Sequence, residues 1–293
     1  MQKKELDSSK IKILVCCHKP CELPKDDVFL PIHVGAAISN VDLRMQRDDQ
    51  VNGESCDNIS AKNKSYCELT AMYWAWKNIK KLYPDLEYIG LNHYRRYFVE
   101  EHYDTEIPET RIGNYKFPIN IILRKLYKYK GGIIARPVSL PYSLSIAYCV
   151  AHNSSDFRIL KDIIKSKYSD YIPYFEKEIE LGNKFSAYNM FVLKIDDFTS
   201  YCEWLFGILS EIEEKCNITN YDAYQKRIYG FMAERLLRVW CSKNIKMQYM
   251  SVVKFCTPVM KISVSHHLKN ICKAFVYEFV FLHIRRWGKI FDL

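Results

Sequence analysis

The chain has 293 residues, of which 48% are apolar, 26% are charged and 14% are aromatic. Lys and Arg number 43 against 34 Asp and Glu, which gives a formal net charge of +9. Gly and Pro contribute only 10 residues each. This composition excludes collagen-like, low-complexity and disordered chains, and it is typical of a globular protein with a sizeable core.

The eleven cysteines do not have the pattern of a disulfide framework, because their number is odd and no secretory signal precedes them. We therefore expect reduced thiols and a cytoplasmic protein. No apolar run approaches the roughly 20 residues that a membrane-spanning helix needs, so we expect the protein to be soluble or to lie on a membrane surface.

The first predicted element is a short buried strand over residues 11–15. It ends in a polar turn that contains His18 and Lys19. A continuous apolar run of this length is typical of a parallel strand. Ligand sites of open α/β sheets lie at the carboxyl ends of the strands, so His18 and Lys19 are candidate ligand contacts.

Residues 42–64 are polar and are expected to form a loop. Ser65 and Glu68 have the spacing of a capping box, and apolar residues at helical spacing then predict a helix that stops before Pro84. A second strand over residues 88–91 leads into a loop that begins Asn92-His93-Tyr94-Arg95-Arg96.

Strands and helices alternate through the rest of the domain. The sequence predicts strands over residues 131–135 and 188–193 and helices over residues 156–167, 195–215 and 229–241. This alternation predicts one α/β domain, and we place it at residues 1–250.

Residues 251–293 form a basic tail. From Lys254 onward, seven Lys and Arg face two acids, a net charge of +5, and aromatic residues lie among them. A basic amphipathic helix of this kind suits the anionic surface of a bilayer. A C-terminal helix that packs on the domain is the alternative, and the sequence leaves both open.

The cluster of His93, Arg95 and Arg96 is the most informative candidate site. Guanidinium groups bind phosphate oxygens with two parallel hydrogen bonds, and the cluster directly follows an apolar strand. A surface patch of ion pairs is the alternative. Because His18 and Lys19 follow another strand of the same sheet, the two basic loops are expected to converge on a diphosphate.

Metal sites have little support in the sequence. Cys16, Cys17, His18 and Cys21 lack a second pair of zinc ligands, and no Asp-x-Asp triplet follows a strand. The chain also lacks a Walker loop and a G-x-G-x-x-G motif, which disfavours a nucleoside triphosphatase and a Rossmann dehydrogenase.

Several segments together resemble a known family. The blocks CHKP, DNISAKNKSYCELTAMYWAWKN, YIGLNHYRRYF, YNMFVLKIDDFTSYCEWLF and YGFMAERLLRVW are similar to a bacterial family of capsular and exopolysaccharide biosynthesis proteins. That family is often described only as a domain of unknown function, and it is associated with glycosyltransferases, including galactofuranosyltransferases. The resemblance covers about residues 11–242.

The resemblance implies a Rossmann-like core of the GT-A type that binds a nucleotide sugar. By this resemblance, the donor-binding residues are His18, Lys19, Asp57, Asn58, Asn63, His93, Arg95 and Arg96. The His and Arg cluster falls where many GT-A enzymes carry Asp-x-Asp, which puts a divalent metal (Mn or Mg) in doubt. For Asp57, Asn58 and Asn63, local turn chemistry is the alternative.

Transfer also needs a group that accepts the proton of the acceptor hydroxyl. Glu234 and His152 are the candidates, and each could instead be a structural residue. Asn189 is the candidate contact to the acceptor, with a hydrogen bond at the strand edge as its alternative.

The resemblance therefore implies a hexosyltransferase with a UDP-linked donor, galactofuranose or another hexose. Its product would be a capsular, exopolysaccharide or lipopolysaccharide chain on a lipid-linked acceptor. Membrane contact at the inner face of the cell membrane would come from a tail helix with Lys269, Lys273, Arg285, Arg286 and Lys289.

Two other functions compete with this interpretation. A non-catalytic scaffold of a polysaccharide assembly would share the fold without the chemistry. A nucleic-acid-binding protein is compatible with the net charge, but the charge is spread over the chain and no nucleic-acid-binding motif occurs. We therefore expect no nucleic-acid partner.

Overall fold

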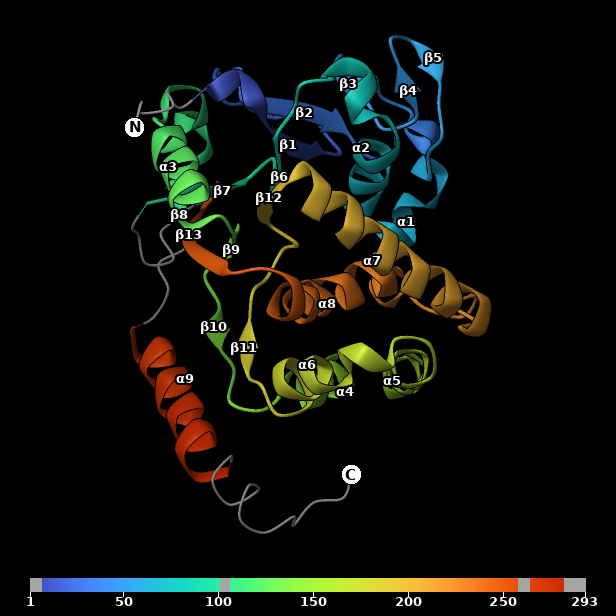
Figure 1. Cartoon of the computed structure of the whole chain (residues 1–293), viewed down its shortest axis with the longest axis vertical. Coiled ribbons are helices and arrows are strands. Elements are labelled where there is room, and N and C mark those ends of the chain that lie inside the picture. The colour runs from blue at the N-terminus through green and yellow to red at the C-terminus, as the bar shows by residue number, and fades with distance from the viewer. Residues whose placement is uncertain (1–6, 101–105, 258–263, 282–293) are drawn as a thin grey trace.

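The computed structural model describes residues 7–100, 106–257 and 264–281 (Figure 1). Within these residues, nine strands form one mixed sheet in the order β12-β9-β13-β7-β6-β1-β2-β3, with β8 paired to β13. β12 also pairs with β6. The strands of this sheet are β1 (Ile11–Cys17), β2 (Phe29–His33), β3 (Gln46–Arg47), β6 (Tyr88–His93), β7 (Arg96–Val99), β8 (Glu106–Pro108), β9 (Gly132–Ala135), β12 (Phe191–Lys194) and β13 (Met247–Cys256).

Two small antiparallel sheets accompany the main one. The first pairs β4 (Gln50–Val51) with β5 (Glu54–Ser55), and the second pairs β10 (Val138–Ser139) with β11 (Lys184–Phe185). The expected loop over residues 42–64 thus holds short strands as well as turns.

The helices in the described residues include nine α-helical segments. They are α1 (Asn63–Tyr66), α2 (Leu69–Leu82), α3 (Ile119–Tyr129), α4 (Leu144–Ala151), α5 (Ser154–Lys167), α6 (Ile172–Phe175), α7 (Ile195–Lys215), α8 (Ile228–Asn244) and α9 (Val264–Val276). Short 3₁₀ and π segments connect several of them.

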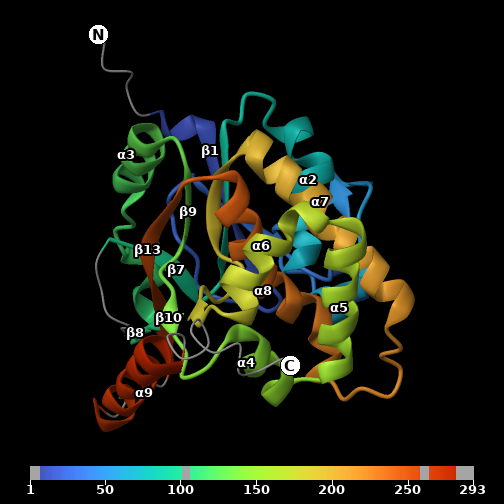
Figure 2. The ribbon, with the colours of Figure 1, turned by 60° about the horizontal axis from the view of Figure 1, so that its bottom comes forward.

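The sheet separates two hydrophobic cores (Figure 2). Leu14 and Cys16 of β1 face the larger core, to which α2, α5, α7 and α8 contribute, while Ile13 and Val15 face a smaller core under α3. Successive side chains of a strand point to opposite faces, so a strand covered on both faces has a continuous apolar run. This arrangement explains why β1 could be predicted from its sequence.

The predicted α/β class is confirmed, and so are four strands and four helices. These elements are β1, β6, β9 and β12 together with α2, α5, α7 and α8. The sequence analysis missed β2, β7 and β13. β13 is half-exposed along much of its length and lacks the continuous apolar run of a central strand.

The predicted capping box at Ser65 and Glu68 is wrong. Ser65 lies inside α1, and its hydroxyl donates to the Lys62 carbonyl at 3.1 Å. The chain then breaks at Cys67, and α2 begins at Leu69 without a side-chain cap. The Glu68 carboxylate instead accepts a hydrogen bond from Asn189, 121 residues away. A tertiary contact has therefore replaced the local one.

The sheet continues past residue 250, because β13 extends to Cys256 and pairs with β7, β8 and β9. A helix, α9, follows in the tail. Arg285, Arg286, Lys289 and the side chain of Lys269 lie outside the described residues. No helix in the described part of the chain is long and apolar enough to cross a bilayer. The boundary between core and tail stays a prediction.

A buried ion pair fastens α8 to the segment Glu176–Glu180, which has π-helical geometry. Arg238 and Glu178 are each 6% exposed. The Arg238 Nε and Nη2 atoms donate to Glu178 Oε2 at 3.0 and 2.8 Å, and Ser242 donates to Glu178 Oε1 at 2.5 Å. Burial penalises an unpaired carboxylate heavily, so each member of the pair depends on the other.

We expect Arg238→Met to lower the free energy of unfolding by about 3–5 kcal/mol, because it leaves Glu178 charged and buried with only the exposed Lys177, at 3.7 Å, as a cationic partner. Urea denaturation measures this loss. The double variant Arg238→Met/Glu178→Gln removes the buried charge and should recover part of the stability. A loss below about 1 kcal/mol for the single variant would show that the pair does not hold α8 in place.

Candidate functional site

The tips of β1 and β6 lie next to each other. The two strands are parallel, with Cys16 paired to His93, and the Tyr94 amide donates to the Cys16 carbonyl at 3.1 Å. His18 and Lys19 directly follow β1, while His93 ends β6. Both predicted basic segments are therefore at one edge of the sheet, as parallel pairing requires.

Three basic side chains gather around the ring of Tyr94. The His18 imidazole meets it edge-on, with ring centroids 5.1 Å apart. Lys19 Nζ lies 5.6 Å from the ring centroid, and Arg95 Cζ lies 4.8 Å from it. A tyrosine ring attracts cations through its quadrupole and keeps their hydrogen-bond donors free for another partner.

The segment after His93 is a tight hairpin rather than the expected loop. His93 pairs with Arg96, so only Tyr94 and Arg95 make the turn between β6 and β7. Arg96 Cζ lies 4.3 Å from the ring centroid of Tyr188. The Nε atoms of Arg95 and Arg96 are buried and have no hydrogen-bond partner among the described residues. Buried donors without a partner are uncommon in proteins, and an ordered water or a bound anion would satisfy these two.

The start of β12 reaches the same edge from the opposite direction. Tyr188 and Asn189 precede this antiparallel strand, and both have left-handed backbones, with φ of 77° and 51°. The His93 Nε2–H donates to the Tyr188 carbonyl at 2.7 Å, and the Tyr188 amide donates to Glu234 Oε1 at 2.8 Å. Strained backbone of this kind occurs mainly at functional sites.

Asn189 connects this turn to α2 and α8. Its Nδ2 donates to Glu68 Oε1 at 2.6 Å and to the Gly230 carbonyl at 3.4 Å. Its Oδ1 is buried without a hydrogen-bond partner in the part of the chain described here. Cys67, next to Glu68, also has a positive φ of 53°. The amide of Asn189 is thus fixed in orientation and has one free acceptor.

Arg227 belongs to this site and was missed by the sequence analysis. Its Nε donates to Cys67 Sγ at 3.3 Å, and its Cζ lies 5.4 Å from the Phe231 ring centroid. Its charge lowers the pKa of both His18 and His93. Arg227 precedes α8 in a polar stretch without a motif, so only the tertiary fold brings it here.

We call this group of residues the strand-tip cluster. Its members are His18, Lys19, Glu68, His93, Arg95, Arg96, Asn189, Arg227 and Glu234. Six of its members are basic and two are carboxylic acids, so the cluster favours an anionic ligand.

Burial shifts the pKa values of three titratable groups in the cluster. Burial, aided by the nearby charge of Glu68, raises the pKa of Glu234 to about 7. Burial and the neighbouring charges of Lys19 and Arg95 lower the pKa of His18. Burial also lowers the pKa of His93, against the opposing charge of Glu68. The imidazoles are therefore neutral at pH 7, and Glu234 is partly ionised.

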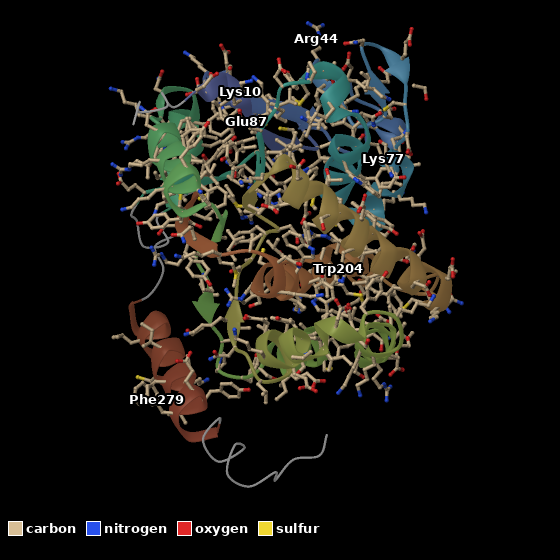
Figure 3. The ribbon with its side chains drawn as sticks, in the orientation of Figure 1. Lys10, Arg44, Lys77, Glu87, Trp204 and Phe279 are labelled. Carbon is tan, nitrogen blue, oxygen red and sulfur yellow. The ribbon has the colours of Figure 1, made fainter. Side chains whose placement is uncertain are left out.

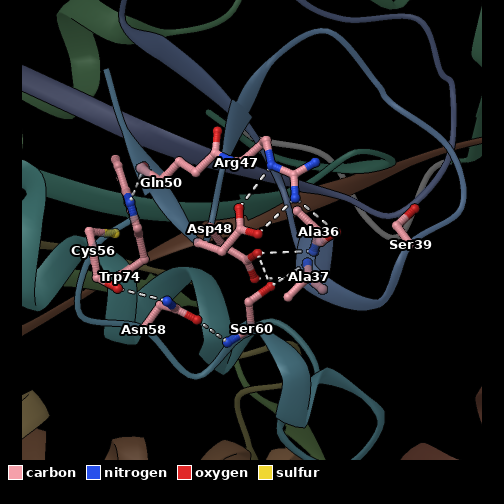
Figure 4. Close-up of polar contacts among 12 residues, drawn as sticks. Ala36, Ala37, Ser39, Arg47, Asp48, Gln50, Cys56, Asn58, Ser60 and Trp74 are labelled. Atoms are coloured by element: carbon pink, nitrogen blue, oxygen red, sulfur yellow. Dashed lines mark hydrogen bonds and ion pairs between the residues drawn. The ribbon is translucent and has the colours of Figure 1, made fainter. Parts of the chain in front are cut away.

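Asp57 and Asn58 make local contacts instead of joining the cluster (Figure 4). Asn58 donates to the Cys56 carbonyl at 2.7 Å and accepts from the Ser60 amide at 3.0 Å. Asp57 accepts from the Tyr73 hydroxyl at 3.2 Å. The bonds of Asn58 are the turn chemistry that was the alternative interpretation, whereas Asp57 ties the segment to α2. A donor-binding role for either residue stays a prediction.

The segment around Ser60 is fixed by a buried carboxylate (Figure 4). Asp48 accepts hydrogen bonds from the amides of Gly35 and Ala36 and from the Ser60 hydroxyl. Asn63 contributes to the same framework, because its Nδ2 donates to the Cys67 carbonyl at 2.7 Å. Asn63 therefore supports the break before Glu68, and its own donor contact stays a prediction.

His152 has a different set of neighbours. Its ring stacks on Phe231 with centroids 4.1 Å apart, and its Nδ1 lies 3.2 Å from Gln225 Oε1. Burial lowers its pKa. His152 thus contacts aromatic rings and Gln225, while Glu234 is held by the Tyr188 turn, so of the two candidate bases Glu234 is the one in the cluster.

No metal-binding group occurs among the residues that the structure describes, where no three His, Cys, Asp or Glu side chains are placed to hold an ion.

The fold is a mixed α/β fold that resembles that of a solved glycosyltransferase. The structure is similar to that of the bifunctional glycosyltransferase WbbM in its apo form, with a TM-score of 0.68 and 26% sequence identity. The similarity covers 87% of this chain and 47% of that chain, so this chain spans about half the length of WbbM. No curated protein matches the sequence significantly.

The chain belongs to the family described as "Domain of unknown function (DUF4422)", whose model matches residues 12–245. The predicted membership in a family described as a domain of unknown function is confirmed. The likeness to WbbM supports the predicted link of that family to glycosyltransferases.

The raised pKa of Glu234 makes stability depend on pH. A folded-state pKa above the unfolded value of about 4.5 means that ionisation opposes folding, so the wild type loses stability as pH rises from about 4.5 to about 7. Glu234→Gln removes the charge. We expect it to gain about 3 kcal/mol relative to the wild type at about pH 8 and less than about 0.5 kcal/mol at about pH 4.5.

Urea denaturation at the two pH values measures this difference. Glu203→Gln changes an exposed carboxylate of α7 and serves as the control, with the same effect expected at both pH values. An equal effect of Glu234→Gln at both pH values would contradict the assigned burial of its charge.

Proposed function

We propose that the protein is a glycosyltransferase of the GT-A type that moves a sugar from a nucleoside diphosphate to a glycan acceptor. One observation carries the proposal: cations from the tips of β1 and β6 converge beside a carboxyl group whose pKa is about 7. The sheet supports a GT-A core, because its parallel strands β1, β2 and β6 are followed by the antiparallel strand β12.

The cations would stabilise the leaving diphosphate. Breaking the anomeric C–O bond places negative charge on the nucleoside diphosphate, and preorganised donors aimed at that charge lower the barrier. Arg95 and Arg96 each keep a buried Nε without a partner among the described residues. His18, Lys19 and Arg227 add positive or donor groups at the same edge. These side chains take the place of an Asp-x-Asp metal site in this proposal.

Glu234 would accept the proton of the acceptor hydroxyl. Catalysis by a general base is most effective when its pKa is near the working pH, and the pKa of Glu234 is about 7. The Tyr188 amide holds one carboxylate oxygen, and the other remains for the acceptor. Asn189, whose Oδ1 is buried without a partner in the described chain, is placed to orient a sugar hydroxyl.

The donor sugar, the product and the place of action are also part of the proposal. The donor would be UDP-linked galactofuranose or another hexose, and the product a capsular, exopolysaccharide or lipopolysaccharide chain. Because such acceptors are carried on lipids at the inner face of the cell membrane, the enzyme would act at that surface. The family resemblance supports these identities, and the basic tail supports the location.

We expect Arg95→Ala and Arg96→Ala each to lower turnover with a nucleotide-sugar donor by at least about 10-fold, the scale of one lost charge-assisted contact. Steady-state kinetics measures the effect, and Arg158→Ala on the exposed face of α5 is the matched control. Wild-type turnover of either folded variant would rule out the diphosphate role of the cluster, whereas no turnover of the wild type with any nucleotide-sugar donor would favour a non-catalytic scaffold.

Thermal denaturation with free nucleotides tests the donor class. A ligand that binds only the folded state adds about 2.7 kcal/mol of stability at 100 times its Kd. We expect UDP to raise the Tm and ADP to leave it unchanged, and we expect Arg96→Ala to reduce the shift. Equal shifts with both nucleotides would contradict a uridine donor, and no shift with either would contradict the donor site.

A further inference from the structure

The helix α9 carries an exposed apolar stripe. Leu268, Ile271, Phe275, Val276 and Phe279 are between 46% and 59% exposed, and their spacing places them along one side of α9 and the following segment Tyr277–Phe281. The rings of Phe275 and Phe279 lie 4.3 Å apart, and Phe279 is at the edge of the molecule (Figure 3). A continuous exposed stripe of this kind marks an interaction surface.

The other side of the same helix is attached to the domain. Ala274 is 3% exposed, and the Tyr277 hydroxyl donates to the Leu181 carbonyl at 3.4 Å. Glu278 forms an ion pair with Lys184 of β11 at 2.5 Å. These contacts orient α9, so the apolar stripe faces outward.

A basic pocket lies near α3 and β13. Its volume is about 310 Å³, and its lining includes Arg124, Lys125, Lys128, Arg136 and Glu100. Four cations thus surround one carboxylate. In the described part of the chain none of the four cations forms an ion pair, so their charge is available to an external anion.

The pocket and the stripe belong to one flank of the molecule. Arg136 lines the pocket, and two residues later the chain enters β10, which contacts α9. Val138 of β10 is itself exposed. Both ribbon views show α3 and α9 along the same side of the protein (Figures 1 and 2). We call the pocket, β10 and the α9 stripe together the basic flank.

We propose that the basic flank docks onto an anionic lipid bilayer. The stripe would enter the boundary between head groups and acyl chains, and the four cations of the pocket would bind lipid phosphates. Lys273, which is exposed on α9, adds a further cation to the stripe. This goes beyond a tail contact, because the four pocket cations come from α3 and from Arg136, which follows β9, rather than from residues 251–293.

The charge and the apolar stripe of the basic flank together favour a bilayer over other binding partners. A second copy of this chain in a symmetric dimer would bring the same unpaired cations toward each other. A nucleic acid would match the cations and leave the aromatic and aliphatic stripe in water. An anionic bilayer satisfies both parts of the surface at once, and the docking does not require transferase activity.

Sedimentation of the 293-residue chain with vesicles tests the proposal. We expect binding to vesicles of equal parts phosphatidylglycerol and phosphatidylcholine, little binding to phosphatidylcholine alone, and weaker binding as salt increases. Equal binding to both vesicles, or to neither, overturns the proposal. It is also overturned if inorganic phosphate at matched ionic strength displaces the protein from the vesicles, since the pocket then binds free phosphate.

Two sets of variants locate the surface. Arg124→Gln/Lys125→Gln/Lys128→Gln should lower the partition coefficient about 100-fold, and Phe275→Ser/Phe279→Ser at least about 10-fold. The matched controls change exposed residues of other helices and should bind like the wild type. They are Lys64→Gln/Arg158→Gln/Lys165→Gln for the cations and Ile146→Ser/Val150→Ser for the apolar stripe. If the controls lose as much as the flank variants, binding is non-specific and the flank is not the docking surface.

All variants should keep the wild-type Tm and the wild-type turnover on a soluble acceptor, because the flank lies outside the strand-tip cluster. A variant that keeps its Tm and loses turnover would instead place the flank in the transfer reaction. Transferase activity without vesicle binding would overturn the docking alone, and vesicle binding without activity would overturn the proposed function alone.

Discussion

The parallel pairing of β1 with β6 is the constraint on which the candidate site depends. Its register sets Cys16 beside His93, so two segments that are 70 residues apart in sequence end at one edge of the sheet. Every cation proposed to bind the diphosphate either follows one of these two strands or is held against them. A shift by one residue would turn Tyr94 away from His18 and would separate the two basic segments.

The antiparallel entry of β12 adds the acid and amide groups to this edge. Tyr188 uses its carbonyl to hold His93 and its amide to hold Glu234, so the backbone of one residue fixes an imidazole and a carboxylate together. The left-handed backbones of Tyr188 and Asn189 cost on the order of 1–3 kcal/mol each. The turn at Tyr188 and Asn189 is strained, and it forms part of the buried surroundings that raise the pKa of Glu234. The rest of the sheet holds this turn in place.

Much of this arrangement could be predicted because it depends on local patterns. The apolar runs of β1 and β6 are continuous since both faces of the sheet are covered, and the basic residues follow directly in sequence. Glu68 and Arg227 could not be predicted in the same way, because their neighbours come from distant segments and no motif marks them. Glu68 even has a plausible local role as a cap, which its hydrogen bond to Asn189 overrides. Asp57 and Asn58 show the reverse case: their types suit ligand contacts, yet the structure uses them for local bonds.

The basic flank and the strand-tip cluster are linked through the chain on both sides of α9. Before α9, β13 ends beside the hairpin of the cluster, where the Phe255 amide donates to the Arg95 carbonyl at 2.8 Å. After it, Glu278 is paired with Lys184, four residues before Tyr188. If α9 lies against a bilayer, the end of β13 and the segment after Lys184 are therefore held there too, and both lead into the strand-tip cluster. An acceptor carried on a lipid would approach from that side, so the same contacts that fix the tail on the domain would place Glu234 and the cations within reach of a membrane-bound substrate.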